Sequence, residues 1–292
     1  MTPAEEAPLP AIEPAQSVDV IVAFIRSQLE QAGFSRLVLG LSGGVDSATV
    51  AYLATAAIGA DNVLAVRMPY RTSSESSEAD ALRVVDALSC RTERVDITPM
   101  VDPMLALISR PDGAASSDEL NVRRGNVMAR QRMIVLYDRS AAFDALVAGT
   151  SNKTEALLGY GTLHGDMAAG LAPIGDLYKT QLRAVATHLG VPAAILDKPP
   201  SADLWPGQTD EGELGRSYDS LDRVLFALVD RRWTLDRCVR AGLDRDLVEW
   251  VASRVARMEF KRQLPPVAKL SLRTPGIDHL YPRRRPGSRR GS

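Results

Sequence analysis

The sequence predicts an α/β protein with a doubly wound parallel sheet that is covered by helices on both faces. Short, continuous apolar runs recur along the chain, as expected for strands that are buried on both faces. Segments with helical periodicity separate each run from the next, and this alternation is typical of a parallel sheet. Polar loops follow three of the runs. The predicted strands lie within residues 36–42, 62–69, 91–98 and 145–151.

The first element is an amphipathic helix over residues 17–33. Its apolar stripe consists of Val18, Ile21, Val22, Ile25 and Leu29. We expect Ser17 to cap its N-terminus and Gly33 to end it. Further helices are predicted over residues 76–88 and 126–143, and helical stretches again between residues 217 and 260.

The amino-acid composition of the chain limits the classes of function that it could have. The chain has 292 residues, 45% of them hydrophobic, and a formal net charge of −1. That content is enough for a substantial core, and the interspersed charges argue against a broad nucleic-acid-binding face. No apolar run reaches the roughly 18 residues of a membrane helix. We therefore predict small-molecule substrates, with no nucleic-acid or membrane partner.

Localisation and domain limits follow from the same composition. Cys90 and Cys238 are too few for a disulfide framework, which fits a reducing cytoplasm. We predict a flexible N-terminal arm over residues 1–16, a single domain over 17–282 and a basic disordered tail over 283–292. The alternative for the arginine-rich tail is an anion-binding role.

Three polar segments follow predicted strands: "SGGVDS" at residues 42–47, "RMPYRTS" at 67–73 and "GTSNKTE" at 149–155. The carboxyl ends of parallel strands lie at one edge of a sheet, where ligands bind in doubly wound folds. We therefore expect the three loops to meet at one site.

Residues 42–47 end a strand and open a helix, so their backbone N–H groups favour an anion such as phosphate. Glycines allow close approach to the main chain, and Ser42 and Ser47 add hydroxyls. Asp46 puts a carboxylate beside this anion site, which is favourable only with a cation such as Mg²⁺ between them. The segment is neither a Walker A loop nor a G-x-G-x-x-G motif. The alternative is a simple glycine turn with serine as N-cap.

"SGGVDS" resembles the PP-loop of the ATP pyrophosphatases, which share the adenine nucleotide alpha-hydrolase-like fold with Rossmann-like layering and cleave ATP between its α and β phosphates. Four further segments occur in the order found in NAD⁺ synthetases, and the resemblance spans residues 18–282. They are "GTSNKTEALLGY", "PIGDLYKTQ", "KPPSADLWPGQTDEGELG" and "EFKRQLPPVAKLSLRT". The chain resembles the ammonia-dependent type, because it has no room for a glutaminase domain.

The resemblance implies ATP-dependent amidation of deamido-NAD⁺ to NAD⁺ through an adenylated nicotinate, with release of AMP and pyrophosphate. Asp46 and Lys179 are the implied catalytic residues, and Asp46 and Glu155 the implied Mg²⁺ ligands. The ATP-binding residues so implied are Gly40, Leu41, Ser42, Gly43, Gly44, Val45, Asp46, Ser47, Arg67, Thr150, Lys179 and Ser201. The plainer alternatives are an ion pair for Arg67, a solvated lysine for Lys179 and a solvated helix-start glutamate for Glu155.

For deamido-NAD⁺ the resemblance implies Arg130 and Lys261. Many members carry a lysine and an aspartate where this chain has Leu163 and Gly170, and a histidine where it has Phe260. We expect His164 or Asp166 to replace the missing polar contacts. The alternatives are surface pairing for Arg130 and a structural role for His164.

Two other functions stay open. One is a PP-loop enzyme that adenylates a different acceptor, as GMP synthetase does; thiolation of tRNA is disfavoured by the charge pattern and the lack of active-site cysteines. The other is a catalytically silent ATP-binding regulator, which would be expected to lose a metal carboxylate. The resemblance further implies a homodimer, and a separate glutaminase is a possible ammonia source.

Overall fold

The computed structural model describes residues 7, 9–108, 117–201, 203–205, 207–275 and 277–278. Four strands form one parallel sheet in the spatial order β3-β2-β1-β4. Their bounds are β1 Leu37–Gly40, β2 Val63–Arg67, β3 Arg91–Arg94 and β4 Leu146–Val147. The chain builds the sheet outward from β1 in both directions, so the predicted doubly wound fold is confirmed.

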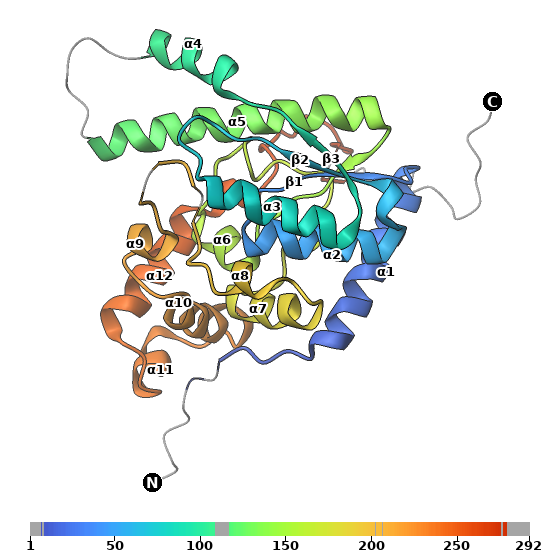
Figure 1. Cartoon of the computed structure of the whole chain (residues 1–292). Coiled ribbons are helices and arrows are strands. Elements are labelled where there is room, and N and C mark those ends of the chain that lie inside the picture. Colours follow the sequence, from blue (N-terminus) through green and yellow to red (C-terminus); the bar gives the residue numbers. More distant parts are fainter. Residues whose placement is uncertain are drawn as a thin grey trace.

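Helices cover both faces of this sheet (Figure 1). Helix α5 (Ser117–Phe143) packs on one face, with α4 (Thr98–Ile108) against it. Helices α2 (Val45–Ile58) and α3 (Glu75–Leu88) pack on the other face. Helices α1 (Pro14–Ala32) and α7 (Lys179–His188) form a further layer against α2. This layering leaves the carboxyl ends of the strands as the place where loops meet.

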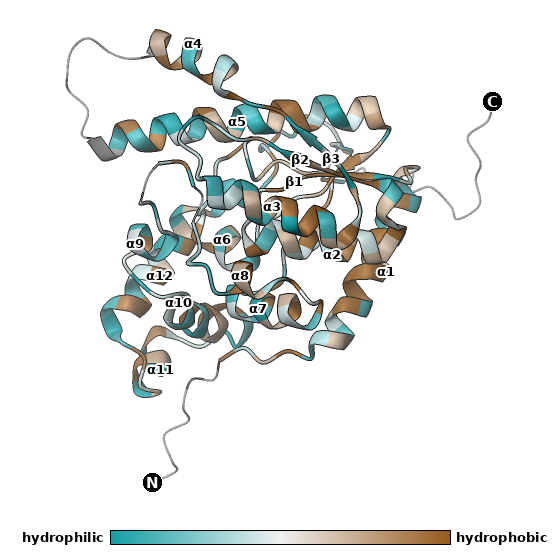
Figure 2. Cartoon of the chain, in the orientation of Figure 1, coloured by the Kyte–Doolittle hydropathy of each residue, from teal (hydrophilic) through white to brown (hydrophobic). Residues whose placement is uncertain are grey.

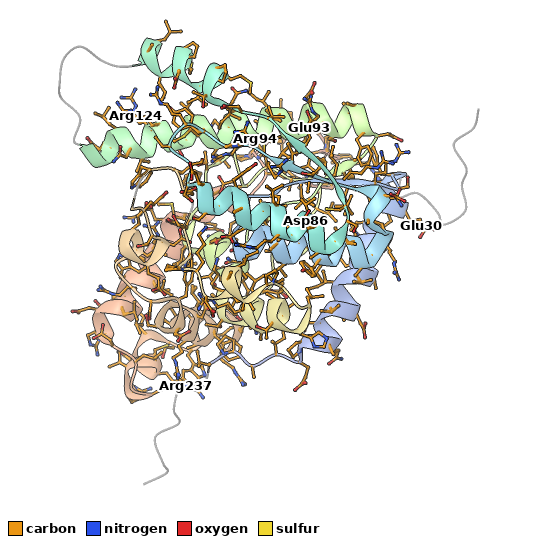
Figure 3. All side chains as sticks on the ribbon, in the orientation of Figure 1. Glu30, Asp86, Glu93, Arg94, Arg124 and Arg237 are labelled. Carbon is orange, nitrogen blue, oxygen red and sulfur yellow. The ribbon has the colours of Figure 1, made fainter. Side chains whose placement is uncertain are left out.

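The core follows the strands that were predicted to be buried. Leu37, Val38 and Leu39 of β1 have no exposed surface, and Figure 2 shows hydrophobic colour over β1. Strand β3 differs, because it is polar and mostly exposed at the sheet edge. Figure 3 labels Glu93 and Arg94 there, and Arg139 of α5 pairs with Glu93 at 2.7 Å. An edge strand pairs on one side only, so charged residues are tolerated.

Helix α1 begins earlier than predicted. It starts at Pro14 with Glu13 as N-cap residue, and the Ser17 hydroxyl instead donates to the Glu13 carbonyl at 2.8 Å. Ser17 as N-cap is therefore wrong; proline is favoured in the first helical turn because its missing N–H costs nothing there. Gly33 ends the helix in the left-handed region, at φ 76°, as predicted.

Part of the segment predicted as an N-terminal arm contacts the rest of the protein, although most of its described residues are exposed or only partly buried. Ala7 is buried, and its carbonyl accepts a 3.2 Å hydrogen bond from Arg223. Residues 283–292, the predicted basic tail, lie outside the described residues, so the limits 17–282 stay a prediction.

The predicted helical stretches after residue 200 form a second core against α6 (Lys153–Leu158). They are α10 (Tyr218–Leu225), α11 (Leu235–Arg240) and α12 (Arg245–Arg257). Two short helices precede them outside the predicted range, α8 (Ala193–Leu196) and α9 (Asp210–Leu214). Cys90 and Cys238 are both buried free thiols. None of the helices in the described part of the chain has the length and apolarity needed to cross a membrane.

Candidate active site

A cavity of about 1030 Å³ opens at the carboxyl ends of the strands. The three polar loops predicted to converge all contribute to its wall, through Ser42, Gly44, Pro69, Arg71, Thr150 and Ser151. It lies beside the β1–β4 pair, where the winding of the sheet reverses direction. Doubly wound sheets place their ligands at this point.

The loop at residues 42–47 is held in shape by its own serines. The Ser42 hydroxyl accepts from the Gly44 N–H at 3.2 Å, and the Ser47 hydroxyl donates to the Gly44 carbonyl at 3.1 Å. Gly44 precedes α2 as its N-cap residue without a side-chain cap, so the simple turn with a serine N-cap does not describe it. The free N–H groups of the first helical turn therefore remain for a ligand.

Gly43 fits the loop because it has no side chain. Its φ is +82°, and a Cβ at this position would lie 2.2 Å from the backbone oxygen of Ser77 on α3. No side chain fits within that distance, so glycine is required for the loop to pack against α3.

Three charged side chains from three helices meet under this loop. The Asp46 carboxylate of α2 contacts the Lys179 ammonium of α7, and a Glu155 carboxylate oxygen of α6 lies 3.6 Å from the same nitrogen. The Asn152 side chain donates to the other Asp46 oxygen at 2.8 Å. Only 2% of the Lys179 side chain is exposed. The two implied metal ligands and the implied phosphate-binding lysine therefore contact one another.

Burial sets the charge balance of this cluster. It raises the pKa of Glu155 to about 8, with Asp46 adding to the rise and Lys179 opposing it. Burial lowers the pKa of Lys179, but Asp46 and Glu155 outweigh it, so that pKa is raised and the lysine stays charged. A further cation would favour the ionised form of Glu155.

Asp46 and Glu155 are the residues that could hold a metal here. In the described part of the chain, no group of three or more His, Cys, Asp or Glu residues is arranged to hold one. Two carboxylates fit Mg²⁺, which keeps water and substrate phosphates as its remaining ligands. The donor set therefore fits an ion that binds together with a nucleotide.

Most of the sequence-derived ATP residues line the cavity: Gly40, Leu41, Ser42, Gly44, Val45, Asp46, Ser47, Thr150, Lys179 and Ser201. Ser201 also donates to the Gln208 carbonyl at 2.7 Å. Gly43 does not line the cavity and packs against Ser77 of α3. Arg67 is not on the wall; it pairs with Glu78, which is, and its Nε donates to the Thr92 hydroxyl at 3.2 Å. Its geometry is that of the structural ion pair.

The residues predicted for deamido-NAD⁺ divide into two groups. Asp166 and Lys261 line the cavity. Arg130 and His164 are exposed and do not line it; Arg130 donates to the Leu163 carbonyl at 3.3 Å, and His164 has a φ of 58°. Of the two replacements considered for the missing polar contacts, only Asp166 is on the wall.

Sequence reasoning missed Arg132, which lines the cavity and donates to the Met68 carbonyl at 3.1 Å. Helical spacing contained the signal, because Arg132 shares a face with the buried Met128 and Val135 and Arg130 does not. Burial lowers the pKa of Arg132.

Asn152 was also missed. It caps α6 in a capping box with Glu155, and the spacing N-x-x-E is readable from sequence. Its second role, the hydrogen bond to Asp46, is visible only in the fold.

The family model "NAD synthase" matches residues 17–265. A protein named NH(3)-dependent NAD(+) synthetase from Chlorobaculum tepidum is 51% identical over 264 residues, covering 90% of this chain and 92% of that protein.

Solved structures agree. An NH3-dependent NAD synthetase from Campylobacter jejuni has a TM-score of 0.73 and 32% identity, covering 89% of this chain and 100% of that one. An NMN synthetase from Francisella tularensis has a TM-score of 0.74 and 29% identity, covering 88% and 99% respectively. Together with the phosphate loop and the carboxylate–lysine cluster, these matches show that the chain belongs to the NAD synthase family.

Proposed function

We propose that this protein is an NH3-dependent NAD⁺ synthetase, a ligase that amidates deamido-NAD⁺ with ammonia and ATP. The observation that carries the proposal is the meeting of Asp46, Glu155 and Lys179 under the phosphate-type loop. Relatives with this name are about half identical over 90% of the chain. The alternative of a silent regulator predicts loss of a metal carboxylate, and both are present.

The chemistry requires activation of a carboxylate. Ammonia cannot displace oxide from it, so the nicotinate oxygen attacks the α-phosphorus of ATP, forming an acyl-adenylate and releasing pyrophosphate. Ammonia then attacks the acyl carbon, AMP leaves with the bonding electrons, and one proton of the ammonia nitrogen is released to give the neutral amide. The protein must bring two anions together, and the loop N–H groups with Lys179 supply positive charge for this purpose.

We infer that Mg²⁺ is bound by Asp46 and Glu155 when ATP is present. The ion would neutralise phosphate charge. A cation at this position would stabilise the ionised form of Glu155, which burial disfavours. Lys179 keeps its own charge and remains available to the phosphates.

A homodimer is also proposed. Apolar side chains on the outer surfaces of α4 and α5 support it: Met104, Leu107, Ile134 and Tyr137 are all exposed. A cytoplasmic location and a separate glutaminase as ammonia source stay predictions.

The test is an assay with purified protein, ATP, Mg²⁺, ammonium and deamido-NAD⁺, in which NAD⁺ and pyrophosphate are followed together. We expect equal amounts of both, and neither without deamido-NAD⁺. A parallel reaction with nicotinate mononucleotide in place of deamido-NAD⁺ tests which acid is amidated, because a similar structure belongs to an NMN synthetase. Absence of both products would falsify the proposal. Pyrophosphate formed only with another acid would favour the PP-loop alternative.

A further inference from the structure

We propose that Arg254 of α12 is a substrate-binding residue, whose guanidinium joins Lys261 in binding an anionic group of deamido-NAD⁺. This role rests on the proposed function. None of the segments that the chain shares with NAD⁺ synthetases contains Arg254. A guanidinium here would also provide a charged contact to the substrate in a chain that has Leu163 and Gly170 where many relatives have charged residues.

Arg254 and Lys261 line the same end of the cavity, together with Gly161, Thr162 and Asp166. Both are held by carbonyl oxygens at the C-terminal end of α6 and just beyond it. The Arg254 Nε donates to Leu158 at 2.9 Å, and the Lys261 Nζ donates to Gly159 at 2.8 Å and to Gly161 at 2.6 Å. These bonds fix two positive side chains on one stretch of wall.

Neither cation forms an ion pair within the described residues. Arg254 uses only its Nε in hydrogen bonding there, and its guanidinium carbon lies 5.4 Å from the centre of the Trp250 ring. Its two terminal nitrogens therefore remain as a planar pair of donors. Such a pair matches the two oxygens of a phosphate or a carboxylate.

The local charge favours an anion. Burial lowers the pKa of Arg254, and the neighbouring Arg257 adds to this; burial also lowers the pKa of Lys261, which Asp166 partly offsets. Two partly buried cations with one nearby carboxylate leave an excess of positive charge. An anionic ligand would relieve it.

A purely structural role is the competing explanation, because cations near a helix C-terminus stabilise it. Arg262 provides the comparison. It caps α6, donating to the carbonyls of Ala156 at 3.2 Å and Leu157 at 2.8 Å, and it also donates to Val255 of α12 at 2.9 Å. Arg262 does not line the cavity. Arg254 and Arg262 thus share the capping role and differ in access to the ligand.

The experiment compares Arg254→Met with Arg262→Met in the full chain. For Arg254→Met we expect KM for deamido-NAD⁺ to rise at least about tenfold while KM for ATP stays near the wild-type value. For Arg262→Met we expect a lower Tm and an unchanged KM for deamido-NAD⁺. Arg257→Met, on the exposed surface of α12, controls for the loss of one positive charge.

Inhibition by NAD⁺ identifies the bound group, because NAD⁺ has the pyrophosphate but lacks the nicotinate carboxylate. Equal weakening of NAD⁺ and deamido-NAD⁺ binding by Arg254→Met assigns the pyrophosphate, and weakening of deamido-NAD⁺ alone assigns the carboxylate. If Arg254→Met changes only Tm, as Arg262→Met does, the inference is wrong. A wild-type protein that makes no NAD⁺ would instead contradict the proposed function.

Discussion

The buried carboxylate of Asp222 accepts a 2.6 Å hydrogen bond from the hydroxyl of Thr154, 68 residues earlier in the chain. Its other oxygen accepts from the Thr180 N–H at 2.9 Å and the Thr180 hydroxyl at 2.8 Å. The Thr154 hydroxyl in turn accepts from the Lys179 N–H at 3.0 Å. Asp222 therefore joins the first turns of α6 and α7, which carry Glu155 and Lys179.

Asp222→Asn should weaken this junction, because an amide has one acceptor oxygen and its NH2 group would face donors. We expect the free energy of unfolding to fall by about 1–3 kcal/mol. We also expect kcat to fall more than KM for deamido-NAD⁺ changes, since the displaced groups lie at the phosphate end. Urea denaturation and steady-state kinetics measure both. Asp219→Asn, exposed on the same helix, should change neither; equal effects in the two variants would contradict the positioning role.

Gly43→Ala should be costly for two reasons, its left-handed backbone and the contact with Ser77. Gly190→Ala separates the two, because Gly190 has a φ of +79° and open space around it. We expect about 1 kcal/mol for Gly190→Ala from backbone strain. Gly43→Ala should lose more stability and raise KM for ATP, as measured by thermal unfolding and ATP titration. Equal losses would mean that α3 yields to the added methyl.

Asp46→Asn should abolish turnover. The substitution removes a negative charge from the proposed metal site and a partner of Lys179 while preserving side-chain size. The assay is NAD⁺ formation over a series of Mg²⁺ concentrations, with circular dichroism to check folding. A folded variant with wild-type activity would contradict the role assigned to Asp46.

Binding of deamido-NAD⁺ should weaken at alkaline pH, because the Lys261 ammonium loses its charge there. Burial lowers its pKa below the ordinary 10.5, with Arg254 and Arg130 lowering it further and Asp166 opposing them. Below its pKa the ammonium attracts the anionic substrate; as the pH rises through that pKa the charge is lost and affinity falls. The fall should therefore begin at a lower pH than for an exposed lysine. Calorimetric titration of deamido-NAD⁺ without ATP measures this.

Lys261→Arg is the matched variant, because arginine stays charged throughout this range. Its affinity should be nearly independent of pH where that of the wild type declines. Parallel pH profiles in the two proteins would show that another group titrates.

Local sequence patterns were sufficient to predict much of the secondary structure of this protein. The four strands, most of the helices and the phosphate-type loop depend on periodicity, glycine positions and turns that involve neighbouring residues. Where local signals competed, boundaries moved: Pro14 starts α1 in place of Ser17. The placement of Arg132 on the cavity wall was also contained in the helical spacing, although the family motif alone directed attention to Arg130.

Sequence by itself therefore determined the fold class, the polar loops and the residue types that suit phosphate and metal chemistry. Tertiary structure alone decided which of those residues act together. Asp46 and Lys179 are 133 residues apart and meet because α2 and α7 pack on the same side of the sheet. Arg67 forms an ion pair because α3 brings Glu78 beside it. Such pairings depend on packing and charge across distant segments, which no local pattern encodes.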